Sequence, residues 1–205
     1  REGPALGIEI GGLYAAEAMM LARYYMFLQV YFHEIRRAYD LHLIDFLKTL
    51  LPNGKFPTKI KDYLNYDDYS VLHKVKEAID KKRKNKNLAE IIFNRKHFQK
   101  VKEHPTVRPT EKEVTLFEKN HEKLNNKFPG IKMDKAEDAP NKFKKEYFYL
   151  REKDFHSAKD KWVEIDNRSD IVKQLEPVTK YRLYAPDDKN LASLKKEIED
   201  LDWNP

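Results

Sequence analysis

The stretch that decides the fold is residues 12–51, which read GLYAAEAMMLARYYMFLQVYFHEIRRAYDLHLIDFLKTLL. It contains no Pro and no Gly after its first residue, and residues of high helix propensity dominate its first turns. A pair of glycines precedes Leu13, and Pro-Asn-Gly follows Leu51, so helix-ending signals stand at both ends. The sequence therefore predicts a helix from Leu13 to Leu51, about 55 Å long, which either crosses a whole helical domain or kinks midway.

The side chains of this helix sort into rows when 100° of rotation is assigned to each residue. Arg23 lies on the polar side, and Phe27 and Tyr31 follow it at i+4 and i+8. A polar half that mixes Arg, His and Tyr with Met and Phe is typical of a helix that lines a cleft. The alternative is a core helix with a salt-bridged, solvated back. The predicted apolar arc consists of Leu21, Tyr24, Tyr25, Leu28, Phe32, Ile35 and Tyr39.

Composition limits what the 205 residues can be. Hydrophobic residues make up 40%, with 12 Tyr and 11 Phe, which is enough for a core and excludes a disordered chain. The chain has no Cys, which removes disulfides and thiolate metal sites and favours a cytoplasmic location. No apolar run approaches the roughly 20 residues of a membrane span, so we expect no membrane partner. A surface rich in Lys and Glu and poor in Gln is typical of a thermophile.

The pattern changes character near residue 94. Before it, helices are predicted at 59–64, 67–79 and 88–93, after a short lead-in strand at 6–10. After it, predicted strands at 97–103, 146–151, 161–165 and 181–184 alternate with helices at 110–128, 171–175 and 191–201. This order predicts a small antiparallel sheet with helices on one face. The predicted fold class is mainly α with an α+β appendage: a helical domain at 1–93 and an α+β domain at 94–205.

Most sequence motifs of catalysis are missing. There is no P-loop, no G-x-S-x-G and no G-x-G-x-x-G, and neither His-Glu pair continues to H-E-x-x-H. Asp67 and Asp68 suggest a metal site, but paired acids at the start of a helix more commonly serve as caps and partners of the helix dipole. The residues by themselves thus predict a two-part domain with one unusual helix.

Residues 22–33 (ARYYMFLQVYFH) resemble the "AR-x-x-M-x-x-x-VY-x-H" helix of HD-domain phosphohydrolases, and more narrowly of those related to deoxynucleoside triphosphate triphosphohydrolases. A Gly-x-x-Ala-Ala-Glu segment precedes this helix, as in the family. Four further landmarks follow in family order, at residues 66–71, 94–98, 169–172 and 181–184. The ordered set covers nearly the whole chain.

The resemblance implies a helical HD core followed by an α+β appendage, with hydrolysis of (deoxy)nucleoside triphosphates at a divalent metal held by His and Asp residues. It implies that Arg23 contacts phosphate, where a guanidinium fork is better suited than an ammonium, and that Tyr31 and Phe27 line the substrate pocket. His33 and Arg37 are candidates for anion contacts. The alternatives are an intrahelical ion pair for Arg23 and a core position for Tyr31.

One departure from the family decides what the chain can do alone. No His-Asp dipeptide occurs in it, and the family's metal ligands lie upstream of the long helix. We therefore interpret the chain as the C-terminal part of such an enzyme, with no catalytic residue or metal ligand of its own, and expect it to be inactive alone. The expected partners are a (deoxy)nucleoside triphosphate, the N-terminal HD portion that it lacks, and further copies of itself in a homo-oligomer.

A second hypothesis is a regulatory, nucleic-acid-binding or oligomerisation module without catalytic activity. Residues 81–86 read KKRKNK, and the formal net charge is +6. Basic runs of this kind attract phosphate backbones, and the apolar arc of the long helix offers a surface for a partner subunit.

Overall fold

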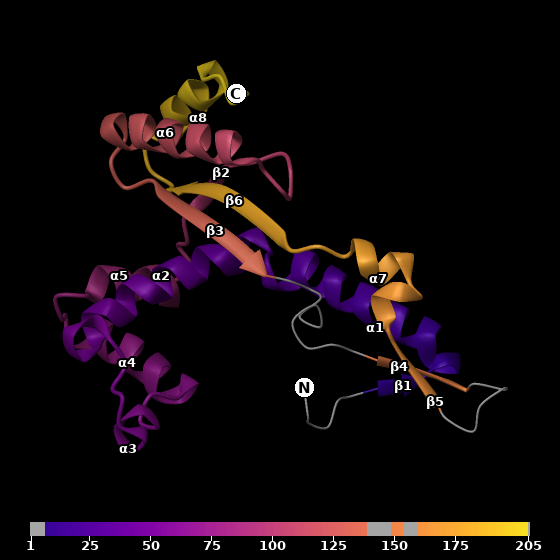
Figure 1. Cartoon of the computed structure of the whole chain (residues 1–205). Coiled ribbons are helices and arrows are strands. Elements are labelled where there is room, and N and C mark those ends of the chain that lie inside the picture. Colours follow the sequence, from indigo (N-terminus) through magenta and orange to yellow (C-terminus); the bar gives the residue numbers. More distant parts are fainter. Residues whose placement is uncertain (1–6, 139–148, 154–159, 205) are drawn as a thin grey trace. The chain divides into compact units, whose positions relative to one another are not determined.

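The computed structural model describes residues 7–138, 149–153 and 160–204 (Figure 1). The chain divides into two compact units. The first unit comprises residues 1–33, 106–108 and 136–180. The second comprises residues 34–105, 109–135 and 181–205. Each unit takes residues from both sides of residue 94. The predicted domain boundary near that residue stays a prediction.

The long predicted helix forms three elements. These are α1 (Leu13–Met26), the π-helical turn η2 (Phe27–Tyr31) and α2 (Glu34–Leu50). At the interruption the amide of Phe32 donates to the carbonyl of Phe27, five residues back, over 2.8 Å. Of the two alternatives for the long helix, a midway break is the one observed, although the break needs neither Gly nor Pro.

Packing explains the π-helical turn. In an α-helix, residues five apart point about 140° away from one another. Phe27 and Phe32 are nevertheless both buried in one cluster with Ala136 and Val178, and their ring centroids lie 5.7 Å apart. The wider turn brings both phenyl rings to the same side, and the burial of two Phe side chains offsets the poorer backbone geometry.

The first unit builds a small sheet under α1. Strand β1 (Gly7–Glu9) pairs in parallel with β4 (Tyr149–Lys153), which pairs antiparallel with β5 (Asp160–Glu164). Residues 146–148 of the predicted strand lie outside the described residues. The short helix α7 (Asp170–Gln174) begins at Ser169, whose Oγ accepts from the amide of Val172 over 3.1 Å. The same Oγ donates to Glu17 over 2.6 Å, which ties α7 to α1.

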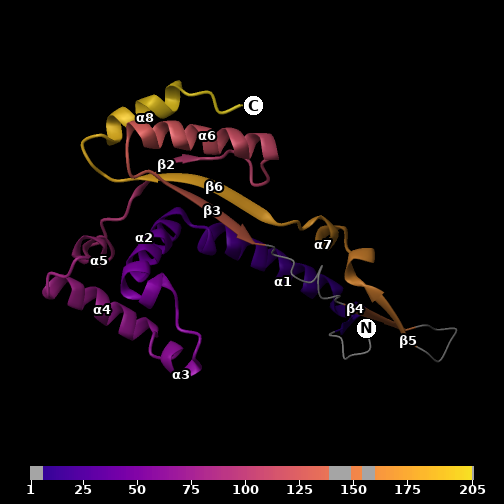
Figure 2. The same ribbon diagram turned by 60° about the vertical axis from the view of Figure 1, so that its left-hand side comes forward.

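The second unit holds three further helices that follow α2 and two that cover the other sheet. The first three are α3 (Ile60–Tyr63), α4 (Asp68–Asp80) and α5 (Lys86–Phe93). The sheet has the order β2 (Gln99–Glu103), β6 (Val178–Ala185) and β3 (Lys132–Asp138). Helices α6 (Glu111–Lys127) and α8 (Leu191–Asp200) lie on one face of it (Figure 2). Their shared core includes Phe117, Leu124, Leu183, Leu194 and Ile198.

The predicted fold class is confirmed: the chain is mainly α with an α+β part. One strand was not predicted, because β3 reads KMDKAED and its buried positions include Asp134 as well as Ala136. A charged residue in the buried row hides the alternation by which a strand is recognised. Among the described residues no helix is long and apolar enough to cross a membrane.

Helix α6 begins with the predicted capping box. The amide of Thr110 donates to Glu113 Oε2 over 2.6 Å, and the amide of Glu113 donates to Thr110 Oγ1 over 3.4 Å. We expect Thr110→Ala to lower the free energy of unfolding by about 1 kcal/mol, because an amide at the helix start loses its acceptor. Urea unfolding measures this, and Thr110→Ser, which keeps the hydroxyl, should recover most of the loss. Equal losses in both variants would contradict the capping role.

Candidate functional site

The residues that the sequence singles out form one row along α1 and η2. Arg23, in the last turn of α1, places its guanidinium carbon 5.0 Å from the ring centroid of Phe27. Phe27 is buried, and its ring centroid lies 5.1 Å from that of Tyr31, which is 41% exposed. A cation over the face of an aromatic ring is an attractive arrangement. The predicted i, i+4, i+8 row is thus present, with a cation and an exposed phenol on either side of a buried ring.

Two residues of the row bound the π-helical turn, which begins at Phe27 and ends at Tyr31. Such turns occur inside α-helices frequently at functional sites. Packing holds this one in place, because Phe27 belongs to a buried cluster of the first unit. The neighbouring side chains of Tyr25, Met26 and Val30 are exposed, so a strip of apolar surface borders the row. The row is therefore held by buried packing at Phe27 and is open to solvent at Tyr31.

His33 and Arg37 belong to different units. His33 is exposed and is the last residue of the segment 1–33 of the first unit, whereas Arg37 lies on α2 in the second unit. Arg37 Nε donates to Asp134 Oδ2 over 3.0 Å, and Nη1 donates to Asp40 over 3.2 Å. Hydrogen bonding to Asp134 raises the pKa of Arg37, although burial acts in the opposite direction. Arg37 thus joins α2 to β3, and the anion contacts of Arg37 and His33 stay predictions.

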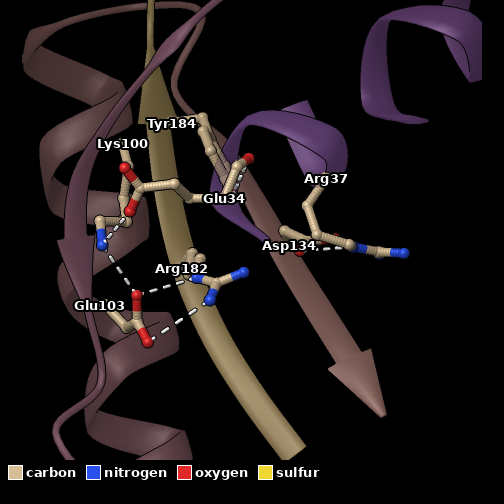
Figure 3. Close-up of polar contacts among 7 residues, drawn as sticks. All are labelled: Glu34, Arg37, Lys100, Glu103, Asp134, Arg182 and Tyr184. Atoms are coloured by element: carbon tan, nitrogen blue, oxygen red, sulfur yellow. Dashed lines mark hydrogen bonds and ion pairs between the residues drawn. The ribbon is translucent and has the colours of Figure 1, made fainter. Parts of the chain in front are cut away.

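A separate polar network of the second unit appears in the same view as the Arg37–Asp134 pair (Figure 3). Glu103 accepts from Arg182 Nε and from Lys100 Nζ, both over 2.9 Å. Lys100 also pairs with Glu34, whose carbonyl accepts from the hydroxyl of Tyr184 over 3.0 Å. Burial raises the pKa of Tyr184 to about 12, so this hydroxyl stays protonated at neutral pH and can donate. The network ties α2 to β2 and β6.

Sequence reasoning missed this network. Its partners lie far apart in the chain, as with Arg182 and Glu103, 79 residues apart. Glu34, the first residue of α2, pairs with Lys100 on β2. Nothing in the spacing of the other residues indicates which charges meet.

The described residues do not fit the metal that the resemblance implies. Residues 7–138, 149–153 and 160–204 contain no group of three or more His, Asp or Glu side chains placed to hold a metal ion. Asp67 serves as a cap: its Oδ1 accepts from the amide of Ser70 over 2.7 Å, which lowers the pKa of Asp67.

The family model described as "HD associated region" matches residues 2–131, which is more than half of the chain. This chain belongs to the HD-associated region family. The match includes α1, η2 and α2, and hence the whole row from Arg23 to Tyr31. Membership in this family confirms the coarser part of the resemblance, a relation to HD-domain proteins.

Two solved structures are similar in fold to this chain. A hypothetical protein from Aquifex aeolicus is 26% identical with a TM-score of 0.68, and the match covers 93% of this chain and 46% of that one. A phosphohydrolase from Bacteroides thetaiotaomicron is 20% identical with a TM-score of 0.56, covering 86% and 51% of the two chains. The second likeness shows the fold alone. No curated protein matches at a significant level. The chain spans about half the length of these two proteins.

Proposed function

We propose that this HD-associated region forms the C-terminal part of an HD-domain phosphohydrolase that hydrolyses (deoxy)nucleoside triphosphates. The observation that carries the proposal is the Arg23–Phe27–Tyr31 row on a π-helical turn. Family membership and a structural neighbour described as a phosphohydrolase support it. In this proposal the metal and its ligands belong to the half of such proteins that this sequence does not span.

The role of each side chain follows from its chemistry. Arg23 binds the phosphates, because a guanidinium offers several N–H donors in one plane and matches phosphate oxygens in pairs. Stacking over Phe27 restricts that plane, so less rotamer freedom is lost when phosphate binds. Tyr31 presents a flat, exposed ring beside the cation, where the sugar of the nucleotide would lie. The chain binds and orients the substrate in this proposal and is inactive alone.

The test uses the complete open reading frame that encodes this chain, with release of phosphate and triphosphate measured in the presence of a divalent metal. We expect Arg23→Lys to lower kcat/KM about tenfold, since lysine keeps the charge but lacks the planar guanidinium. Arg23→Gln should lower it about a hundredfold, since glutamine lacks the charge as well. Tyr31→Phe should have a smaller effect, because the ring is kept.

The matched control is Arg36→Lys, a change at an exposed arginine of α2 that lies outside the row. It should leave kcat/KM within about twofold of the unaltered protein. Equal losses in Arg23→Lys and Arg36→Lys would indicate a general effect of replacing a surface guanidinium. The absence of metal-dependent release from every nucleoside triphosphate tried would overturn the proposed activity itself.

A further inference from the structure

A pocket of about 830 Å³ opens in the second unit, where the end of α2 meets α4, α5 and the loop between those two helices. A volume of this size is typical of sites for small molecules. The pocket lies apart from the Arg23 row, which belongs to the first unit. Six of its lining side chains matter here: Tyr66, Lys74, Glu77, Arg83, Lys84 and Leu88.

Positive charge is in excess in this pocket. Glu77 accepts from Lys74 Nζ over 3.1 Å, from Lys81 Nζ over 2.9 Å and from Arg83 Nη2 over 2.7 Å. These hydrogen bonds, the one from Lys81 first, lower the pKa of Glu77 to about 2. Of these cations, Lys74 and Arg83 line the pocket with Glu77, and Lys84 adds a third, so the lining has an excess of two positive charges. The excess favours an anionic ligand.

The loop that carries two of these cations is held in place. Helix α4 ends at Asp80, Lys82 beyond it lies in the left-handed region (φ 48°), and the amide of Arg83 donates to the carbonyl of Ala78 over 3.0 Å. Further along, Asn85 Nδ2 donates to Thr49 Oγ1 over 3.0 Å, which fixes the loop to α2. The backbone around Arg83 and Lys84 is therefore ordered before any ligand binds, which reduces the entropy cost of binding.

The remaining walls suit a flat apolar group. Leu88 and the ring of Tyr66 line the pocket. The Tyr66 ring is supported from outside by Phe56, with ring centroids 5.8 Å apart and planes at 87°. Pockets that combine apolar and aromatic walls with a few charged side chains are the usual sites of small-molecule recognition.

We infer that this pocket binds a small organic phosphate, with the phosphate group at Lys74, Arg83 and Lys84 and a planar apolar portion between Tyr66 and Leu88. A phosphate dianion balances the excess of charge that Glu77 leaves, and the guanidinium of Arg83 can pair with two of its oxygens. Cations near the end of α4 also interact with the helix dipole. That interaction accounts for Lys81 and Arg83 but not for Lys74, which lies in the middle of the helix.

The test is titration calorimetry of this chain with two probes, phenyl phosphate and inorganic phosphate, at low ionic strength. We expect saturable binding of phenyl phosphate at one site per chain, and weaker binding of inorganic phosphate. Arg83→Gln should weaken both about tenfold, since a charge-assisted pair is lost. Tyr66→Ala should weaken phenyl phosphate alone, because only that probe carries a ring.

The matched control is Arg95→Gln. Arg95 is also exposed and also follows a helix end in the left-handed region (φ 56°), but it does not line the pocket. Its loss should leave both affinities unchanged. If Arg83→Gln fails to fold by circular dichroism, Lys84→Gln tests the same contact. Absence of saturable binding at millimolar probe, or equal losses for Arg83→Gln and Arg95→Gln, would overturn the inference. Binding of a polynucleotide, with no binding of either phosphate probe, would overturn it as well.

Discussion

We expect replacement of Asp134 with Asn to lower the free energy of unfolding of this protein by about 3–5 kcal/mol. Asp134 is 2% exposed, and its carboxylate accepts from two nitrogens of Arg37. Asn has the same shape but no charge, so the guanidinium of Arg37 is left partly buried without its principal counter-charge. The effect is large because a partly buried charge loses its partner, whereas the net contribution of an intact ion pair to stability is modest.

The measurement is urea unfolding at neutral pH, followed by far-UV circular dichroism. The double variant Arg37→Met, Asp134→Leu removes both charges together, and we expect it to be more stable than Asp134→Asn. Arg168→Gln is the matched control, because it breaks a two-pronged pair with Glu152 at the surface, where Arg168 Nε donates over 2.6 Å. It should change stability little. If Asp134→Asn behaves like Arg168→Gln, the pair with Arg37 does not hold α2 on β3.

Features that depend on neighbours in the sequence could be predicted. Asp67 caps α4 through Ser70, and Thr110 caps α6 through Glu113, each three residues away. The Arg23–Phe27–Tyr31 row follows from i+4 spacing in the same way, since side chains four apart on a helix are neighbours. Such contacts are determined by the backbone geometry of one element, whatever the rest of the chain does.

Features that depend on distant residues could not. The predicted apolar arc included Tyr25 and Ile35, which are exposed, and left out Met20 and Phe27, which are buried. The arc assumed one uninterrupted α-helix, whereas the π-helical turn changes the phase of the side chains after Phe27, which accounts for Ile35. Met20 and Tyr25 precede the turn on α1, where the choice of the buried face was itself wrong. That turn exists because Ala136 and Val178 complete the cluster around the two rings, and no local pattern announces them.

A fall in pH from about 6.5 to about 4 should destabilise the protein through His42. This side chain is 1% exposed on α2, and its Nε2 accepts from the amide of Phe98 over 3.0 Å. Burial, and next the nearby charge of Lys132, lower the pKa of His42 from 6.5 to about 4. Throughout this interval the unfolded chain therefore binds a proton at His42 that the folded chain does not bind. The stabilisation is complete above pH 6.5 and is lost as the pH falls towards 4.

The size of the effect follows from the interval. At about 1.4 kcal/mol for each pH unit, this single group accounts for about 3 kcal/mol between pH 6.5 and 4. Urea unfolding at a series of pH values measures the slope, and His42→Gln supplies the comparison, because its amide oxygen can accept from Phe98 but does not titrate here. Carboxylates contribute equally to both slopes, so their difference isolates the imidazole. Parallel slopes would mean that His42 takes up its proton in the folded protein as readily as in the unfolded chain. The hydrogen bond from Phe98 to a neutral ring would then not be what holds α2 beside β2.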